Sequence, residues 1–417
     1  DMCNGTIMDK LISFALPLML SGILQLMFNA VDIIVVGRFS GSEALAAVGS
    51  TTALINVFTN LFIGISLGAN VLAARFFAAG RKEEMSETVH TAITLALISG
   101  ILMAFVGLFF SRGALELMGT PEDVIDLSAL YMRIYFMGMP FFMLYNYGAA
   151  ILRAVGDTKR PLYFLIIAGV INAGLNMILV IVFGLGVAGV GIATVFSQMV
   201  SCVLVLTCLC RTDGSYKLSF SKLSIKGYYL KQIFQVGIPA GIQSTVINFS
   251  NALLQSSVNS FGSTAMAGYT AANNILGFLY VSINSVTQAC MSFTSQNFGV
   301  GKYKRMDRVL IDCMILSVSV ALVLGCGAYF FGAKILQIYT EEADVIQCGV
   351  EILSITTVPY FFCGIMDLFP GALRGMGYSA VPMVLSIIGT VGMRILWIFA
   401  FFPQHRSLYF LFISYPA

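Results

Sequence analysis

The sequence predicts an all-α polytopic membrane protein, in which two parallel, pseudo-symmetric bundles of six helices surround a central cleft. Three observations predict this fold: an apolar composition, apolar blocks of membrane-spanning length and an internal repeat. Hydrophobic residues make up 58% of the 417 residues and charged residues 10%, with a mean hydropathy of +0.89. Soluble domains carry about 25% charged residues, so this composition excludes a soluble protein.

The apolar residues form blocks that are each close to the length of about 20 residues that a helix needs to cross a bilayer. The first block carries Asp32 and is longer than the core of a cleavable signal peptide. We expect eleven spans and a twelfth that is cut short at Ala417: 11–36, 47–74, 89–110, 124–150, 161–183, 187–209, 231–259, 264–295, 309–331, 345–371, 381–402 and 407 onward.

The basic residues between the spans predict the orientation in the membrane. One alternate set of connecting segments holds seventeen Lys and Arg residues, whereas the other set holds only Arg38, Arg112, Lys334 and Arg406. Cytoplasmic loops carry the excess of Lys and Arg in membrane proteins. We therefore expect a multi-pass protein of the cytoplasmic membrane, with the N-terminus and the connection 211–230 in the cytoplasm.

An internal repeat relates the two halves of the chain. The stretch LRAVGDTKRP at 152–161 returns as LRGMGYSAVP at 373–382, which is 221 positions later, and Pro17 has its counterpart in Pro239. Six spans are repeated in order, and an even number makes the two copies parallel, an arrangement known from transporters. We expect an N-terminal lobe at 1–210, a basic cytoplasmic loop at 211–230 and a C-terminal lobe at 231–417.

The repeated stretch has the composition of a tight turn between two helices. Gly156 and Gly377 suit a left-handed cap at the end of one helix, while Pro161 and Pro382 suit the first turn of the next. The motif therefore turns the chain at the inner face of the membrane. A role in gating is the alternative.

Asp32 is the first candidate for chemistry, because a charged side chain inside a bilayer is costly and usually functional. Gln25, Asn29 and Asp32 share one face of the first helix. In apolar surroundings this carboxyl group could load and release a proton near neutral pH. The alternative is an interfacial Asp that reaches the outer headgroups beside Arg38. Pro17 removes a backbone hydrogen bond from the same helix and is a candidate hinge, as is Pro239 in the second copy.

Three further charged residues lie inside the expected spans. Asp367 and Arg394 are in adjacent spans and are a candidate charged pair, either a static ion pair or a part of ion coupling. Arg133 lies in the fourth span, where we expect a structural role with an acid of the external loop as its partner.

Uncharged polar residues follow one face of several spans. Alone, such residues can bond across helix interfaces, but their number favours a wet central cleft that binds substrate. The pair Asn172 and Asn176 forms such a polar stripe on the fifth span. The candidates for the substrate cleft are Gln25, Asn56, Asn60, Asn248, Asn251, Gln255, Asn284 and Gln288.

With these residues placed, the chain resembles the bacterial MATE (multidrug and toxic compound extrusion) transporters along essentially its whole length. The resemblance rests on Pro17, on Asn29 and Asp32 in NAVDIIVVG, on Asn176 in NAGLNMIL, on GVAGVGIAT at 186–194 and on the doubled turns. It implies two six-helix lobes that export amphipathic, often cationic, organic compounds in exchange for H⁺ or Na⁺. It also implies a cation-coupling site at Asp32, Asn29, Asn172 and Asn176.

The sequence departs from that pattern at two positions that are acidic in some members, where it has Val180 and Asn248. A lipid-linked precursor flippase is the alternative transporter, although the spans hold only two arginines for a diphosphate. A membrane enzyme is disfavoured, because the two histidines lie near span ends and no phosphate-binding loop occurs. We expect no metal or cofactor besides the coupling ion, small organic substrates, no nucleic acid partner and function as a monomer.

Overall fold

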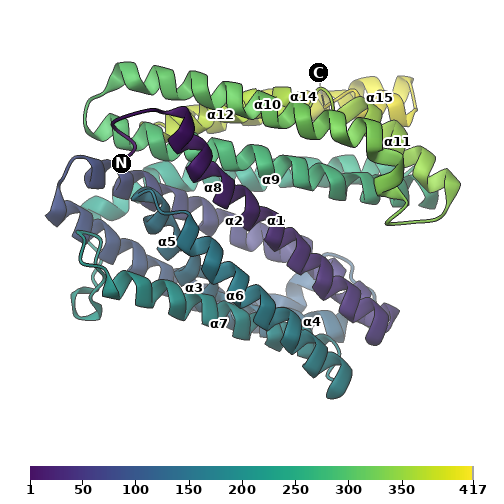
Figure 1. The fold of residues 1–417 in the computed structure, drawn as a ribbon. Helices are drawn as coiled ribbons and strands as arrows, with labels where there is room; N and C mark the ends of the chain where they lie inside the picture. Colours follow the sequence, from purple (N-terminus) through teal and green to yellow (C-terminus); the bar gives the residue numbers. More distant parts are fainter. Residues whose placement is uncertain (416–417) are drawn as a thin grey trace. The chain divides into compact units, whose positions relative to one another are not determined.

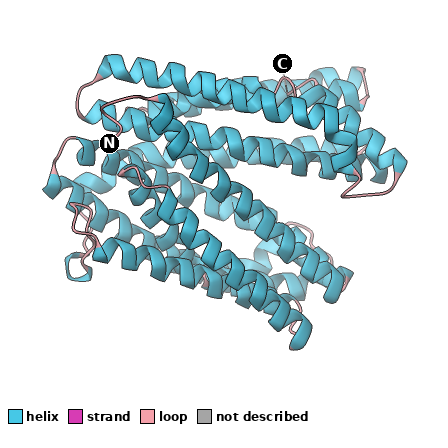
Figure 2. Cartoon of the chain, viewed as in Figure 1, coloured by secondary structure: helices cyan, strands magenta, loops and turns pink. Residues whose placement is uncertain are grey.

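The computed structural model describes residues 1–415, which fold into helices joined by short connections without a strand among them (Figures 1 and 2). The first repeat contains these helices: α1 (Met8–Phe39), α2 (Ser42–Ala78), α3 (Lys82–Leu117), α4 (Glu122–Met137), α5 (Met139–Ala154), α6 (Lys159–Asn176) and α7 (Val187–Arg211). The second repeat contains these: α8 (Gly227–Asn259), α9 (Ser263–Gly299), α10 (Tyr303–Leu336), α11 (Ala343–Thr356), α12 (Phe361–Gly375), α13 (Ala380–Ser386), α14 (Met393–Leu396) and α15 (Leu408–Phe412).

The expected spans coincide with helices or bent helix pairs; α6 continues as a π-helix at Met177–Val182, and the span at 381–402 is one continuous helix made of α13, α14 and the π-helical segments Ile387–Gly392 and Trp397–Phe401. This confirms the predicted fold class. Among the described residues, eight helices are long and apolar enough to cross a membrane, or up to ten if each bent pair forms one span. The helix α8 is 33 residues long but does not pass this test. Its polar side chains, Ser244, Asn248, Asn251 and Gln255 among them, lower its hydropathy.

The fourth span of each repeat is bent at the same place. The break between α4 and α5 lies at Gly138 and bends the span by 47°, and the break between α11 and α12 bends it by 53°. Pro359, which the repeat aligns with Gly138, lies in the second break. Pro140 also follows Gly138 in the first turn of α5, so a proline lies at or beside the break in both repeats and accounts for the bend.

The repeated turns have the predicted geometry. Gly156 and Gly377 adopt φ angles of 95° and 97°, which only glycine reaches without strain. The amide of Asp157 donates to the carbonyl of Leu152, and the amide of Tyr378 donates to that of Leu373, both at 2.9 Å. These are the bonds of a Schellman motif, which satisfies carbonyls at the end of a helix.

The chain divides into two compact units whose boundaries differ from the predicted lobes. The first unit consists of Asp1 and Leu20–Gly241, and the second consists of Met2–Met19 and the residues from Ile242 onward. The helix α1 therefore begins in the second unit and ends in the first, whereas α8 begins in the first and ends in the second. The two crossing points are 222 positions apart, so the repeat preserves them.

In the first unit, the beginning of α8 lies directly against α2. A Cβ atom added to Gly68 would come within 2.1 Å of the carbonyl oxygen of Ile233, and one added to Gly64 within 2.4 Å of the Cα atom of Gly241. The backbones of the two helices are therefore in contact. This contact requires glycine, because any side chain would force the helices apart.

In the second unit, the beginning of α1 lies among α9, α10 and α12. Leu11, Phe14 and Ala15 are buried in a cluster with Val286 and Phe293. The rings of Phe14 and Phe293 meet edge to face with their centroids 5.7 Å apart. Here side chains rather than bare backbone make the contact.

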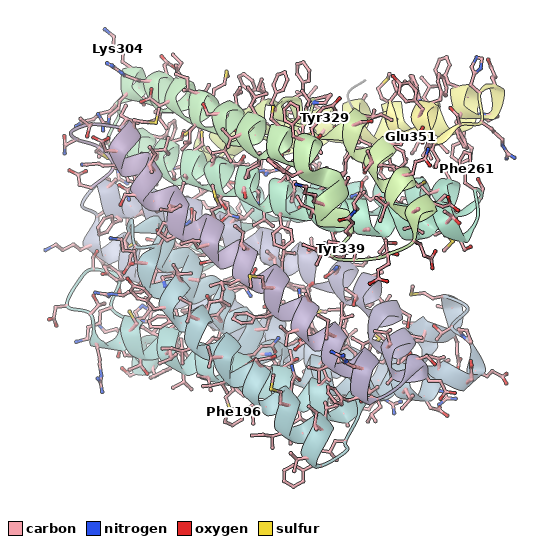
Figure 3. All side chains as sticks on the ribbon, turned by 45° about the vertical axis from the view of Figure 1, so that its right-hand side comes forward. Phe196, Phe261, Lys304, Tyr329, Tyr339 and Glu351 are labelled. Atoms are coloured by element: carbon pink, nitrogen blue, oxygen red, sulfur yellow. The ribbon has the colours of Figure 1, made fainter. Side chains whose placement is uncertain are left out.

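Large apolar side chains cover the outer faces of both units. Phe196 on α7 and Tyr329 on α10 are examples, with 44% and 48% of their surface exposed (Figure 3). Exposure of this kind is unusual for a soluble protein and is expected for helices that face lipid.

Candidate functional site

Asp32 lies on the part of α1 that belongs to the first unit, beside α6. Phe28, one turn before it, packs against Gly169 of α6, where an added Cβ atom would overlap the ring at 1.9 Å. This contact brings α1 close enough for Asp32 to reach the polar residues of α6. The carboxyl group is half-buried and turns toward the bundle, which disfavours the interpretation that it reaches the headgroups.

A chain of hydrogen bonds connects Asp32 to the interior of the first unit. Asn176 donates from Nδ2 to Oδ1 of Asp32, and also to Oδ1 of Asn172 at 2.9 Å. Asn172 donates to Oγ of Ser197 on α7 at 3.2 Å, and Ser197 donates to the carbonyl of Thr194 at 2.8 Å. The fixed carbonyl at the end of the chain sets the direction of every bond, so an N–H group points at the carboxylate.

One oxygen of this network has no partner. The Oδ1 atom of Asn176 is buried and accepts no hydrogen bond within residues 1–415. A buried acceptor without a donor is costly unless a ligand or another state of the site uses it. Together, the Oδ1 atoms of Asp32 and Asn176 give the site two oxygens that can accept a proton or hold a small cation.

Two tyrosines of α4 adjoin the site and were not predicted from the sequence. The charge of Asp32 acts on both Tyr131 and Tyr135, whose rings lie 6.1 Å apart. Their spacing of four residues puts both rings on one face of α4. This spacing, together with Ser197 and Gln198 on the sixth span, could have indicated that the fourth and sixth spans contribute to the site. These two spans lack the stripes of Asn and Gln residues that drew attention to the other helices.

Asn29 and Gln25 do not join the Asp32 network. Both side chains are exposed and form no hydrogen bond within the described residues. The structure thus unites Asp32, Asn172 and Asn176 of the predicted cation site, and places Asn29 outside their bonds.

Most of the predicted cleft residues are polar groups without a protein partner. Asn56 and Asn60 in the first unit, and Asn248, Asn284 and Gln288 in the second, are exposed or half-buried and make no side-chain hydrogen bond within residues 1–415. Bonds across helix interfaces therefore do not explain them. Amide groups at membrane depth are costly in lipid, so these side chains favour water-filled surroundings. In contrast, Gln255 donates to Asn259 at 2.8 Å.

The predicted pair of Asp367 and Arg394 is not formed. No ion pair within 4.0 Å joins them in the described part of the chain. Arg394 instead donates from Nη1 to Oδ1 of Asn251 at 2.6 Å and to Oγ of Ser250 at 3.2 Å, because it points toward α8. The basic group whose charge acts on Asp367 is Arg374, which is two turns further along α12.

Arg133 also differs from the prediction. Its side chain is exposed and forms no ion pair within residues 1–415. The acids of the neighbouring connection pair with Arg112 instead, which bonds Asp126 at 2.7 Å and Glu116 at 3.3 Å.

The duplicated set of spans, the apolar outer surfaces, the half-buried carboxylate and the unpaired amides are together typical of a polytopic helical transporter. Comparison with known proteins identifies it further. The MatE family model matches residues 17–178 and 239–399, one match in each repeat. The chain belongs to this family, the multidrug and toxic compound extrusion transporters, and is a transporter rather than an enzyme.

The relatives span almost the whole chain. A probable multidrug resistance protein of Bacillus subtilis, YoeA, is 31% identical over 416 residues, which cover 97% of this chain and 89% of that protein. The multidrug export protein MepA of Staphylococcus aureus (strain MSSA476) is 22% identical over 95% of this chain and 88% of its own. The probable multidrug resistance protein NorM of Thermotoga maritima is 26% identical over 92% and 83%.

Solved structures show the same fold. An outward-facing multidrug resistance MATE family transporter has a TM-score of 0.91 at 21% identity, with 100% of this chain and 93% of that chain covered. A MOP superfamily transporter from Pyrococcus furiosus has a TM-score of 0.93 at 22% identity, with the same coverage.

Proposed function

We propose that the protein is a secondary active antiporter that exports amphipathic, often cationic, organic compounds across the cytoplasmic membrane in exchange for H⁺ or Na⁺. The observation that carries the proposal is the half-buried carboxylate of Asp32, which is bonded to Asn176 and has no cation paired with it among residues 1–415. An acid in this position can be neutralised by an ion that enters from outside.

The hydrogen-bond chain suggests how the site changes on loading. With Asp32 ionised, Asn176 donates to it through Nδ2 while its own Oδ1 remains without a partner. A protonated Asp32 becomes a donor and needs an acceptor. Rotation of the Asn176 amide by about half a turn would present Oδ1 as that acceptor and would give up the bond from Nδ2 to Asn172, so loading would rearrange the chain. For Na⁺, the same two oxygens would be ligands, since hard cations bind oxygen.

Alternating access of the two units would then depend on α1 and α8. Each helix passes from one unit to the other two residues after its proline, Pro17 or Pro239. A proline removes one hydrogen bond of the helix and makes bending easier at that point. We infer that these prolines are the hinges that let the units move without breaking the chain.

The unpaired amides of each unit are candidate contacts for the substrate. Amide groups can hydrogen-bond many different compounds, which suits a transporter of low selectivity. The names of the relatives, which are multidrug resistance and export proteins, support organic substrates of this kind. They do not favour the lipid-linked flippase. We further infer a cytoplasmic N-terminus and activity as a monomer.

The test is transport of a cationic dye in proteoliposomes, with a pH gradient and a Na⁺ gradient imposed separately. Asp32→Asn keeps the size of the side chain but cannot carry a charge, so we expect at least a tenfold loss of gradient-driven transport. Asp9→Asn, an exposed position near the start of the same helix, is the matched control and should transport normally. Wild-type transport that ignores both gradients, or full activity of Asp32→Asn, would refute the proposal.

A further inference from the structure

The helix pair that carries Asp32 in the first unit has a counterpart in the second unit with the opposite charge. The repeat aligns Asp32 with Leu254, Asn172 with Met393 and Asn176 with Trp397, so the acidic site is not duplicated. Arg394 occupies the second pair of helices instead, next to Met393, and bonds Ser250 and Asn251 of α8. Its side chain is only 8% exposed.

The guanidinium group of Arg394 uses only one of its three nitrogens for hydrogen bonds. Both bonds to α8 come from Nη1. The Nε atom is buried without a partner, and Nη2 has no hydrogen bond within residues 1–415 and is not among the fully buried atoms. Nε and Nη2 therefore keep N–H groups that nothing in the described part of the chain accepts, and of the two only Nη2 is accessible. An accessible guanidinium N–H group can donate a charge-assisted hydrogen bond to a carboxylate.

No acidic side chain of the described chain neutralises Arg394. It has no ion pair within 4.0 Å in that part of the chain, and its guanidinium group lies over the ring of Tyr415, whose centroid is 4.9 Å from Cζ. Asp367 lies on α12, where the charge of Arg374 acts on it. A cation buried in a membrane protein without an anion is costly, and such groups usually mark a binding or transport site.

Amides with free hydrogen-bonding capacity lie on α8 near the residues that bond Arg394. Asn248 lies one turn before Asn251 on the same face of the helix, is exposed and has no bond within the described residues. Asn251 itself uses its oxygen on Arg394 and keeps its amide N–H groups. A ligand held by Arg394 would therefore meet further polar groups on its accessible side.

We propose that Arg394 is an anion-binding residue of the second unit, which binds the carboxylate of an amphipathic organic substrate through its accessible Nη2 group. The inference rests on the proposed function, and it names the residue that would bind the acid group of a zwitterionic or acidic substrate. Ser250 and Asn251 are positioning residues, because both accept hydrogen bonds from Nη1 and leave Nη2 without a partner.

The experiment compares two dyes that differ only in the acid group. Rhodamine 19 has a free carboxylate, and rhodamine 6G is its ethyl ester with the same cationic ring system. Equilibrium binding of each dye to the purified full-length protein in detergent is measured by fluorescence anisotropy. We expect Arg394→Gln to weaken binding of rhodamine 19 at least tenfold and to change binding of rhodamine 6G less than twofold, because the ester has no negative charge to pair with a guanidinium group.

Two further variants keep the test decisive if Arg394→Gln folds poorly. Arg394→Lys retains the charge without the planar edge and should recover part of the affinity for rhodamine 19. Asn251→Asp places a carboxylate beside Nη1, which would compete with the ligand for Arg394 and should also weaken binding of rhodamine 19 selectively. Arg133→Gln, the other arginine within a span, is the matched control and should bind both dyes like the wild type.

Equal losses for both dyes in the Arg394 variants would assign Arg394 a structural role and overturn the proposal. So would a wild type that binds the ester but not the acid. The Asp32→Asn variant distinguishes a failure of this inference from a failure of the proposed function. That variant should still bind rhodamine 19 through Arg394, even though its gradient-driven transport is lost.

Discussion

The N-terminal parts of α1 and α8 can be compared directly, because each helix begins in one unit and ends in the other. α1 begins in the second unit, and α8 begins in the first. The start of α8 lies on α2 through glycine, backbone against backbone. The start of α1 is held among α9, α10 and α12 by Leu11, Phe14 and other buried side chains. The repeat aligns Gly237 with Ala15 and Gly68 with Ala289. Both repeats therefore have a first helix that begins in the opposite unit, but only the second repeat makes this contact through glycines.

The segments that precede the two helices are also fixed, each by a neighbouring helix of the same unit. The backbone of Met2–Asn4 accepts hydrogen bonds from Lys302 and Arg305 at the start of α10. The connection before α8 is tied to α3, because the amide of Ser219 donates to Nε2 of His90 at 3.1 Å and that of Lys226 donates to Oγ1 of Thr91 at 3.3 Å. The beginning of each helix is therefore held both by its own packing contacts and by the hydrogen bonds of the segment that precedes it.

The largest effect is expected where backbone meets backbone. A Cβ atom at Gly68 would lie 2.1 Å from the carbonyl oxygen of Ile233. The side chain of Gly68→Leu would therefore prevent α8 from packing against α2. We expect at least a tenfold loss of monodisperse protein after purification. Gly49→Ala on the same helix, where an added Cβ atom meets nothing within 4 Å, is the control and should be purified normally. Normal yield of Gly68→Leu would mean that the two helices do not need this contact.

A smaller effect is expected at the side-chain contact of α1. Phe14 is 4% exposed and Phe293 is 1% exposed, and removal of a buried Phe ring costs about 3–5 kcal/mol. Phe14→Ala should therefore lower the thermal unfolding temperature in detergent by several degrees while leaving a folded protein. Phe110→Ala, whose ring is 66% exposed on α3, should shift it much less. If both variants unfold at the same temperature, the start of α1 contributes little to the second unit.

The smallest effect is expected at the N-terminal clamp. Lys302 donates from Nζ to the carbonyl of Cys3 at 2.9 Å and to Oδ1 of Asn4 at 2.7 Å, but it is exposed to solvent. Exposed charged contacts are worth no more than about 1 kcal/mol. Lys302→Met should raise hydrogen exchange of the first amides of α1 without a measurable change in unfolding temperature. Lys304→Met is the control at the start of the same helix (Figure 3), and should leave the exchange unchanged.

The sequence predicted most of the fold, because spans and turns depend on local patterns. The apolar blocks gave the helices, and the glycines and prolines of the repeated stretch gave two Schellman turns that the structure confirms. The assignment of α1 and α8 to two units each could not be predicted in this way. It depends on which residues meet across the bundle, and the hydropathy of Met8–Met19 does not differ in kind from that of the residues that follow.

Those residues of the candidate site could be predicted whose polar or charged side chains cost free energy to bury in a membrane. Asp32, Asn172 and Asn176 stood out as polar groups in apolar spans, and the structure brings them together. Tyr131 and Ser197 did not stand out, since Tyr and Ser are ordinary residues of membrane helices. The pairing of Asp367 with Arg394 was wrong because adjacency in sequence order does not fix where a side chain points, and Arg394 points toward α8.

The low hydropathy of α8 has a consequence for how the protein is made. A segment with so many amide and hydroxyl groups partitions weakly into lipid by itself, so its entry into the bilayer during synthesis depends on helices that are already there. The glycines of α2 provide such a docking surface, and α2 leaves the ribosome well before α8 does. We therefore expect the insertion of α8 to depend on the first half of the chain, which is synthesised before it.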